Sequence, residues 1–223
     1  MTKKTNKTIT CISDFHGLLT FKIEPCDLLL IAGDLLPAYH DKFLSANLQI
    51  NWLQNEFKPW LKKQPVKETC LICGNHCWLG EIDNSYFRKI GKKVHYLQDE
   101  EITIQGIRIY GTPHSPEFNN WAFGKTEKSL EKYWSNIPEN IDILLCHCPP
   151  FNIFDKTYNS NGIYRNIGSP SLNKRIDIIR PKYVVFGHAH GEYGRIKIDN
   201  IEYINCSLMN ELYDLCKKPI TIQ

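Results

Sequence analysis

The chain repeats one pattern, in which a short and continuous apolar run ends abruptly in Asp, Asn or His. Runs without alternation of polar and apolar positions indicate strands that are covered on both faces. The pattern predicts such strands at Thr8–Ser13, Cys26–Ala32, Thr69–Cys73, Ile141–Cys146 and Tyr183–Phe186.

Helical periodicity lies between several of these runs. The clearest segment is Lys42–Lys62, where apolar residues recur every three or four positions and Pro65 follows the end. Shorter helices are predicted over Ser129–Ser135 and over Ser171–Ile179, the second beginning at a Ser-Pro pair and ending before Pro181. Strands that alternate with helices indicate crossover units and a largely parallel sheet.

After residue 190 the chain follows a different pattern. Arg195–Ile198 and Glu202–Asn205 alternate polar with apolar positions around Asp199-Asn200, which predicts an antiparallel hairpin. The fold class is therefore α/β with strands of mixed direction.

Composition narrows the class of protein. The 223 residues, 42% hydrophobic and 23% charged, predict a single globular domain over 1–223. The net charge of +3 arises from interspersed residues of both signs, so no dedicated nucleic-acid surface is expected. The longest apolar runs are too short to cross a membrane, and we expect a cytoplasmic protein without a membrane partner.

The nine cysteines do not form a regular framework. An odd number of cysteines at irregular spacing argues against a disulfide scaffold. A zinc site around Cys70, Cys73 and Cys77 is the alternative; it normally needs a second ligand pair at comparable spacing, and the only tight pair elsewhere is Cys146 and Cys148, which bracket a histidine. Reduced thiols that act as small apolar residues are the favoured interpretation, and a redox role for Cys77 or Cys148 stays open.

The polar residues that end the predicted strands form the candidate site. In a parallel sheet, ligands bind at the carboxyl ends of the strands, so residues far apart in sequence are expected to meet there. Asp14 and His16, like His188 and His190, are two positions apart and can project to the same side. The full set of strand-end residues is Asp14, His16, Asp34, Asn75, His76, His147, His188 and His190.

Carboxylate, amide and imidazole ligands together suit Mn, Fe, Zn or Ni. These donors are more numerous than one ion accepts, which predicts two divalent metal ions that share a carboxylate. Such a pair of ions can bind both the attacking and the leaving oxygen at a phosphoryl centre and supply hydroxide at neutral pH.

Five blocks, in this order, resemble the calcineurin-like metallophosphoesterase superfamily: Asp14-x-His16, Gly33-Asp34, Gly74-Asn75-His76, His147 and Gly187-His188-x-His190. Three further segments resemble its metallophosphoesterase-domain-containing phosphodiesterase branch, namely Tyr110–Pro113, His147–Pro150 and Arg180–His188. The resemblance implies a four-layer fold, in which two mixed β-sheets pack as a sandwich flanked by helices.

The resemblance also implies a role for each position. The first metal ion is expected at Asp14, His16 and His190, and Asp34 is expected to bridge the two ions. The second ion is expected at Asn75, His147 and His188. His76 is expected to be catalytic rather than a ligand, because the corresponding residue faces the scissile phosphate and helps to protonate the leaving oxygen.

One departure from the superfamily bears on the substrate. Protein phosphatases of the superfamily carry Asp-Arg-Gly after the bridging carboxylate, whereas this chain reads Asp34-Leu35-Leu36-Pro37. This departure argues against protein phosphatase activity, and the resemblance implies a hydrolase for cyclic nucleotides or nucleotide-like diesters, with manganese as a suitable metal and a metal-bridging hydroxide as nucleophile. A phosphomonoesterase of small metabolites and a non-catalytic metal-binding interaction scaffold are the alternatives.

Substrate contacts are harder to predict. His114 lies in a loop bounded by prolines and is a candidate contact, because such loops near strand ends often line pockets. Trp121 and Phe123 are candidates for stacking on a base. Arg165 is a candidate phosphate clamp, although a solvated loop arginine is the favoured interpretation.

Overall fold

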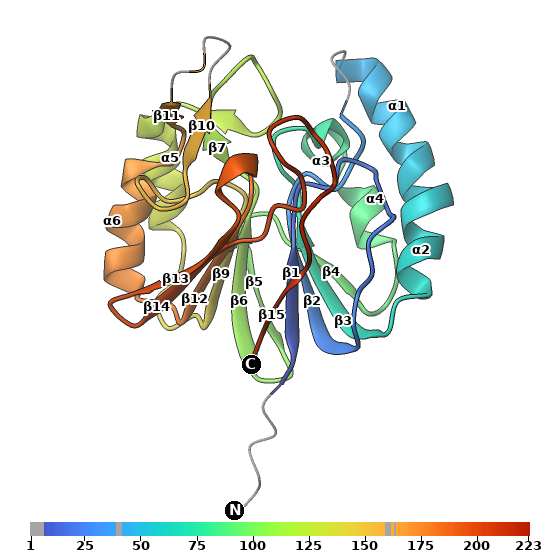
Figure 1. Ribbon diagram of the computed structural model, residues 1–223, viewed down its shortest axis with the longest axis horizontal. Helices are drawn as coiled ribbons and strands as arrows, with labels where there is room; N and C mark the ends of the chain where they lie inside the picture. The colour runs from blue at the N-terminus through green and yellow to red at the C-terminus, as the bar shows by residue number, and fades with distance from the viewer. Residues whose placement is uncertain (1–6, 39–41, 159–161, 163) are drawn as a thin grey trace, which may run out of the picture.

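Two β-sheets face each other at the centre of the protein, and helices cover the outer face of each sheet (Figure 1). The computed structural model describes residues 7–38, 42–158, 162 and 164–223, and of Phe43 it describes the backbone alone. The four layers confirm the architecture that the resemblance implied.

The first sheet has five strands in the order β15-β1-β2-β3-β4. Its parallel strands are β1 (Ile9–Ile12), β2 (Cys26–Ala32), β3 (Val66–Ile72) and β4 (Val94–Tyr96). The C-terminal strand β15 (Ile220–Ile222) joins β1 antiparallel. Its helical segments are α1 (Lys42–Trp52), a π-helical turn (Leu53–Phe57), α2 (Lys58–Lys62), α3 (Trp78–Ile82) and α4 (Ser85–Arg88).

The second sheet has six strands in the order β13-β14-β12-β9-β6-β5. Its four inner strands run parallel and its two edge strands antiparallel. In chain order the strands are β5 (Glu100–Ile104), β6 (Ile107–Thr112), β9 (Ile143–Cys146), β12 (Tyr183–Phe186), β13 (Gly194–Ile198) and β14 (Ile201–Asn205). Its helices are α5 (Glu127–Ser135) and α6 (Pro170–Ile179).

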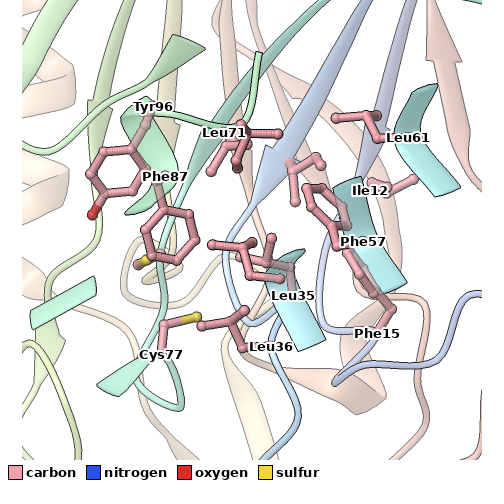
Figure 2. Close-up of a cluster of buried hydrophobic side chains, with 14 of the residues drawn as sticks. Ile12, Phe15, Leu35, Leu36, Phe57, Leu61, Leu71, Cys77, Phe87 and Tyr96 are labelled. Atoms are coloured by element: carbon pink, nitrogen blue, oxygen red, sulfur yellow. The ribbon is translucent and has the colours of Figure 1, made fainter. Parts of the chain in front are cut away.

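The apolar residues of the strands divide into three buried clusters. Alternate residues such as Leu28, Leu30 and Val185 fill the space between the sheets. The residues between them face the helices on either side. Figure 2 shows the cluster beneath α1 and α2, where Phe57 and Leu61 lie near Leu71. Coverage on both faces explains the continuous apolar runs.

The predicted helix over Lys42–Lys62 is confirmed, with a local distortion. The segment is helical throughout, but its middle turn, Leu53–Phe57, is π-helical. Pro59 follows this turn. Because proline has no N–H to donate and its ring crowds the carbonyl four residues earlier, the wider turn accommodates it without ending the helix.

Two other predicted elements are confirmed in detail. Helix α6 begins at Pro170 after the Ser169 hydroxyl, which accepts a hydrogen bond from the Leu172 N–H. Strands β13 and β14 form the predicted hairpin, and Asp199 and Asn200 adopt φ of 47° and 69°. Positive φ at both turn residues gives the twist that suits a two-residue hairpin.

Short elements complete the fold. Strands β7 (Ser115–Pro116) and β8 (Gly124–Lys125) pair parallel, and β10 (Lys156–Tyr158) pairs antiparallel with β11 (Tyr164–Asn166). A 3₁₀ turn covers His190–Glu192. Within the described parts of the chain, none of the helices combines the length and apolar composition needed to cross a lipid bilayer.

The cysteines behave as the favoured interpretation predicts. Eight of the nine are buried, and Cys70 lies in a different apolar cluster from Cys73 and Cys77. Among the described residues, no group able to hold a metal ion contains a cysteine.

Candidate metal centre

The strand-end residues meet at the carboxyl edge of the two sheets. Asp14, His16 and His190 form one buried group, and Asp14, Asp34 and His147 form another. Within each group the potential ligand atoms all lie within 4.8 Å of one another. The two groups share Asp14, so the first sheet and the second sheet contribute to one continuous site.

Glycines allow the loops to approach closely. A Cβ at Gly74 would lie 2.5 Å from Asp34 Oδ1 and 2.6 Å from His147 Cε1. A Cβ at Gly187 would overlap Asp14 Oδ2, and one at Gly33 would overlap the His147 ring. The Gly-Asp, Gly-Asn and Gly-His pairs of the sequence therefore have a steric cause: each glycine leaves space for a neighbouring polar side chain.

The backbone at the site is also unusual. Asp14, His16, Asp34 and His188 have φ of 49°, 38°, 45° and 67°. Non-glycine residues in this region cost about 1–3 kcal/mol each and persist where surrounding structure holds them, often at functional sites. The fold thus maintains strain to direct these side chains.

Three hydrogen-bond acceptors converge around His147. The carbonyl of Ala32 accepts the Nδ1–H of His147 at 2.9 Å, which leaves Nε2 with a lone pair in the neutral ring. That Nε2 lies 2.8 Å from Asn75 Oδ1 and 3.4 Å from Asp34 Oδ2. Acceptors that face one another in a buried site need a cation between them, either a proton or a metal ion.

A second convergence lies around His190. Its Nδ1–H donates to the Asn210 carbonyl at 3.2 Å, and its Nε2 lies 3.4 Å from both Asp14 Oδ1 and His16 Nε2. Asp14 Oδ1 and His16 Nδ1 are buried without a hydrogen-bond partner. The donor set on this side therefore also fits a divalent cation.

Electrostatics set the protonation of the centre. Burial by itself raises the pKa of Asp34, but the charges of His147 and His76 hold it well below its ordinary value. Burial lowers the pKa of His147, yet the charge and hydrogen bond of Asp34 reverse this and raise it to about 9. Burial lowers the pKa of His16 to about 3. A metal ion must displace the proton that His147 holds, so we expect affinity to increase with pH.

The two remaining strand-end histidines lie beside the centre. His188 donates its backbone N–H to Asp14 Oδ2 at 2.9 Å, and its ring centroid lies 5.0 Å from that of His147. His76 donates its backbone N–H to Asp34 Oδ1 at 2.8 Å, and its ring lies 5.1 Å from that of His16. The eight predicted residues are thus brought together.

A cavity of about 540 Å³ opens onto this centre. Asp34, Asn75, His76, His188 and His190 form its polar floor. Its wall comes from segments outside the predicted motifs, with the lining residues Pro116, Glu117, Phe118, Trp121, Thr157, Tyr158, Arg165, Asn166, Ile167, Glu211 and Tyr213. Trp121 and Arg165, which the sequence had offered as substrate contacts, both lie at this wall.

His114 does not line the cavity. Its side chain is buried, its Nε2 lies 2.8 Å from Asp99 Oδ2, and its ring packs 4.0 Å from that of Tyr133. Phe123 is likewise buried. The structure therefore gives both residues a packing role, because strand β6 turns the loop that carries His114 toward α5 rather than toward the site.

The sequence interpretation missed Gln49. This fully buried side chain donates to the carbonyls of His76 at 2.7 Å and Pro37 at 2.9 Å, and it accepts the Leu79 N–H at 2.9 Å. It ties α1 to the loop that carries His76. A polar residue on the apolar face of the Lys42–Lys62 helix was the signal that could have revealed it.

Tyr213 was also missed. Its ring lies 5.0 Å from that of His16, 4.9 Å from His190 and 6.5 Å from His76. The residue follows Asn210, whose Oδ1 accepts the backbone N–H groups of Leu212 and Asp214. No motif of the sequence marks this loop, since its place over the histidines depends on the path of the C-terminal segment.

Comparisons with known proteins agree with this geometry. The chain is 32% identical over 238 residues to the UPF0046 protein T07D4.2 of Caenorhabditis elegans, covering 94% of this chain and 58% of that protein. It is 29% identical to the human metallophosphoesterase domain-containing protein 1, covering 95% of this chain and 69% of that protein. The chain therefore spans somewhat more than half the length of these relatives.

Solved structures share the fold at low sequence identity. The phosphopantetheinyl hydrolase of Mycobacterium tuberculosis has a TM-score of 0.57 at 13% identity, covering 92% of this chain and 90% of that one. The protein TT1561 of Thermus thermophilus has a TM-score of 0.57 at 11% identity, with 92% and 89% coverage. The sequence model of the calcineurin-like phosphoesterases matches residues 7–192. This chain therefore belongs to the calcineurin-like phosphoesterase family, whose members are metal-dependent phosphoester hydrolases that normally bind two divalent metals.

Proposed function

We propose that this protein hydrolyses phosphodiesters of the nucleotide type with two divalent metal ions. Asp14, His16 and His190 would hold one ion, and Asp34 would bridge the pair. Asn75, His147 and His188 would hold the other ion.

The convergence of acceptors carries this proposal. His147 Nε2 faces Asn75 Oδ1 at 2.8 Å and Asp34 Oδ2 at 3.4 Å, and Nδ1 is already used by the Ala32 carbonyl, so either the second proton of a charged ring or a metal ion must lie at Nε2. The unpartnered Asp14 Oδ1 lies on the other side. These atoms would repel one another without a cation, and carboxylate, amide and imidazole donors suit manganese, iron, zinc or nickel.

When bound, two such ions supply positive charge to the phosphoryl oxygens and lower the pKa of water. His76 supplies the remaining chemistry from the chain itself. Its ring lines the cavity, and its backbone N–H is tied to Asp34 Oδ1. Burial lowers the pKa of His76, so its ring is neutral at rest and its N–H can hydrogen-bond the leaving oxygen; to act as the general acid, the ring would first take up a second proton.

The absence of Asp-Arg-Gly after Asp34 favours small diesters over phosphoproteins as substrates. The test compares bis-p-nitrophenyl phosphate, a diester, with p-nitrophenyl phosphate, a monoester, in Mn²⁺ and in EDTA. We expect faster turnover of the diester and loss of activity in EDTA. Faster turnover of the monoester would instead indicate a metabolite phosphatase. Metal binding without turnover of either substrate would indicate an interaction scaffold.

A further inference from the structure

Arg165 brings an uncompensated positive charge to the wall of the cavity. It lies on β11 and lines the same cavity as His76 and Asp34. Among the described residues, no carboxylate lies within 4.0 Å of its guanidinium nitrogens. Glu211, which also lines the cavity, instead accepts hydrogen bonds from the Thr157 hydroxyl at 3.2 and 3.3 Å. The guanidinium is therefore available to a ligand.

A row of aromatic rings connects Arg165 with the metal centre. The guanidinium lies over the Phe118 ring, 4.2 Å from its centroid. The Phe118 ring is 5.2 Å from Trp121, and the Trp121 ring is 4.4 Å from His76. Stacking on an aromatic face orients a guanidinium while its N–H groups stay free to bind oxygen.

The β10–β11 hairpin and the loop between β7 and β8 form this wall, and hydrogen bonds hold both in place. Arg165 pairs with Thr157 across β10 and β11, and directly opposed residues project to the same face. The hydrogen bonds from Thr157 to Glu211 attach this hairpin to the C-terminal segment. In the loop between β7 and β8, the Ala122 N–H donates to the Asn75 carbonyl at 3.0 Å, which attaches the Trp121 loop to the candidate metal centre.

We propose that Arg165, stacked on Phe118, is a binding site for a second phosphate of the substrate, and that Trp121 binds the base between this phosphate and the scissile one. The proposal rests on the proposed function and narrows it. It selects linear nucleotide diesters with an additional terminal phosphate, rather than cyclic mononucleotides, which have a single phosphate.

The proposed phosphate site does not change which bonds are made and broken in the hydrolysis. Water adds its oxygen to the scissile phosphorus, the bond from phosphorus to the leaving nucleoside oxygen breaks, and that oxygen receives a proton. Arg165 takes no part in bond making. It binds the terminal phosphate through paired N–H···O contacts, which are among the strong hydrogen bonds in proteins.

The experiment uses the Mn²⁺-loaded protein with two diadenosine substrates, ApA and its 5′-phosphorylated form pApA. The net free energy of one hydrogen bond between charged groups corresponds to roughly a tenfold preference or more. We expect wild type to favour pApA by at least about tenfold in kcat/KM. Arg165→Met should remove this preference, so that the variant shows equal kcat/KM for ApA and pApA. Arg165→Lys should keep part of the preference.

Binding gives a second readout that does not depend on turnover. Calorimetry should show tighter binding of adenosine 3′,5′-bisphosphate than of adenosine 5′-monophosphate by wild type, and equal binding by Arg165→Met. Arg195→Met is the matched control, because Arg195 is also a strand arginine but pairs with Glu202 away from the cavity. This control should keep the wild-type preference.

Equal turnover of ApA and pApA by wild type would overturn the phosphate site, as would a preference that survives Arg165→Met. Turnover of bis-p-nitrophenyl phosphate without turnover of either dinucleotide would also overturn it, while leaving the proposed function intact. If none of the diesters is hydrolysed, the proposed function fails and this inference fails with it.

Discussion

The floor and the wall of the cavity are built in different ways. The floor consists of strand-end residues such as Asp34 and Asn75, which are buried. Neighbouring glycines leave the space that lets these side chains pack closely together. The wall includes Trp121 from the loop between β7 and β8, Arg165 from β11 and Tyr213 from a C-terminal loop. The residues proposed to carry out the reaction therefore lie at the ends of the sheet strands. The residues proposed to select the substrate lie in loops and short strands, which can change in sequence without altering the sheets.

Asp34→Asn should have the largest effect. Removing the carboxylate charge between the two proposed ions should lower kcat/KM by at least about a thousandfold. Elemental analysis should show a fall from two ions to one or none. The control Asp27→Asn removes a partly buried carboxylate outside the cavity, which pairs with Lys67 and accepts the Thr8 N–H, and it should keep both ions. Two ions retained in Asp34→Asn would exclude the bridging role.

Gly74→Ala tests whether the floor requires close approach. The added Cβ would lie 2.5 Å from Asp34 Oδ1, so the loop must move away from the metal centre. We expect a loss of about 1–3 kcal/mol in the free energy of unfolding, together with weaker metal binding. Gly91→Ala is the matched control, because its nearest neighbour, Val94 Cγ2, is 3.7 Å away. Equal metal affinity in both variants would contradict the steric argument.

His76→Ala separates chemistry from metal binding. The variant should keep its metal content but lose about two orders of magnitude in kcat, as expected for a general acid. The loss should be largest for diesters with a poor leaving group. His95→Ala should behave like wild type, since His95 pairs with Glu68 far from the floor. Wild-type turnover by His76→Ala would show that this residue has no catalytic role.

Gln49→Leu tests how the helix layer supports the floor. It leaves the Pro37 and His76 carbonyls and the Leu79 N–H without their partner, at a cost of about 2 kcal/mol or more in the free energy of unfolding. We expect kcat to fall about tenfold as the His76 loop loses its support. Gln64→Leu is the control. It removes a hydrogen bond to the backbone carbonyl of Trp60 in α2 and should leave kcat unchanged.

Tyr213→Ala should have the smallest effect. Loss of ring contacts with His16 and His190 should raise KM about threefold to tenfold, with both ions retained. Tyr213→Phe should be close to wild type, because the contacts are made by the ring. A complete loss of metal in Tyr213→Ala would show that this loop belongs to the floor rather than to the wall.

The sequence predicted the floor because each candidate ligand follows a buried strand. Parallel pairing aligns the ends of β1, β2 and β3, so Asp14, Asp34 and Asn75 had to meet. The wall could not be predicted in this way. Arg165 and Tyr213 reach the cavity through loop paths and tertiary contacts, which leave no periodic pattern in the sequence. The position of His114 was not predictable for the same reason: its loop places the ring against Tyr133 of α5 and not at the cavity.

The proposed dinuclear centre requires the strand-end acceptors to hold two metal ions around Asp34. Anomalous diffraction from crystals of the Mn²⁺-loaded protein would locate these ions. We predict two anomalous peaks about 3.5–4 Å apart, with the Asp34 carboxylate between them. A single peak, or peaks that lie outside the ring of Asp14, Asn75 and His188, would contradict the account.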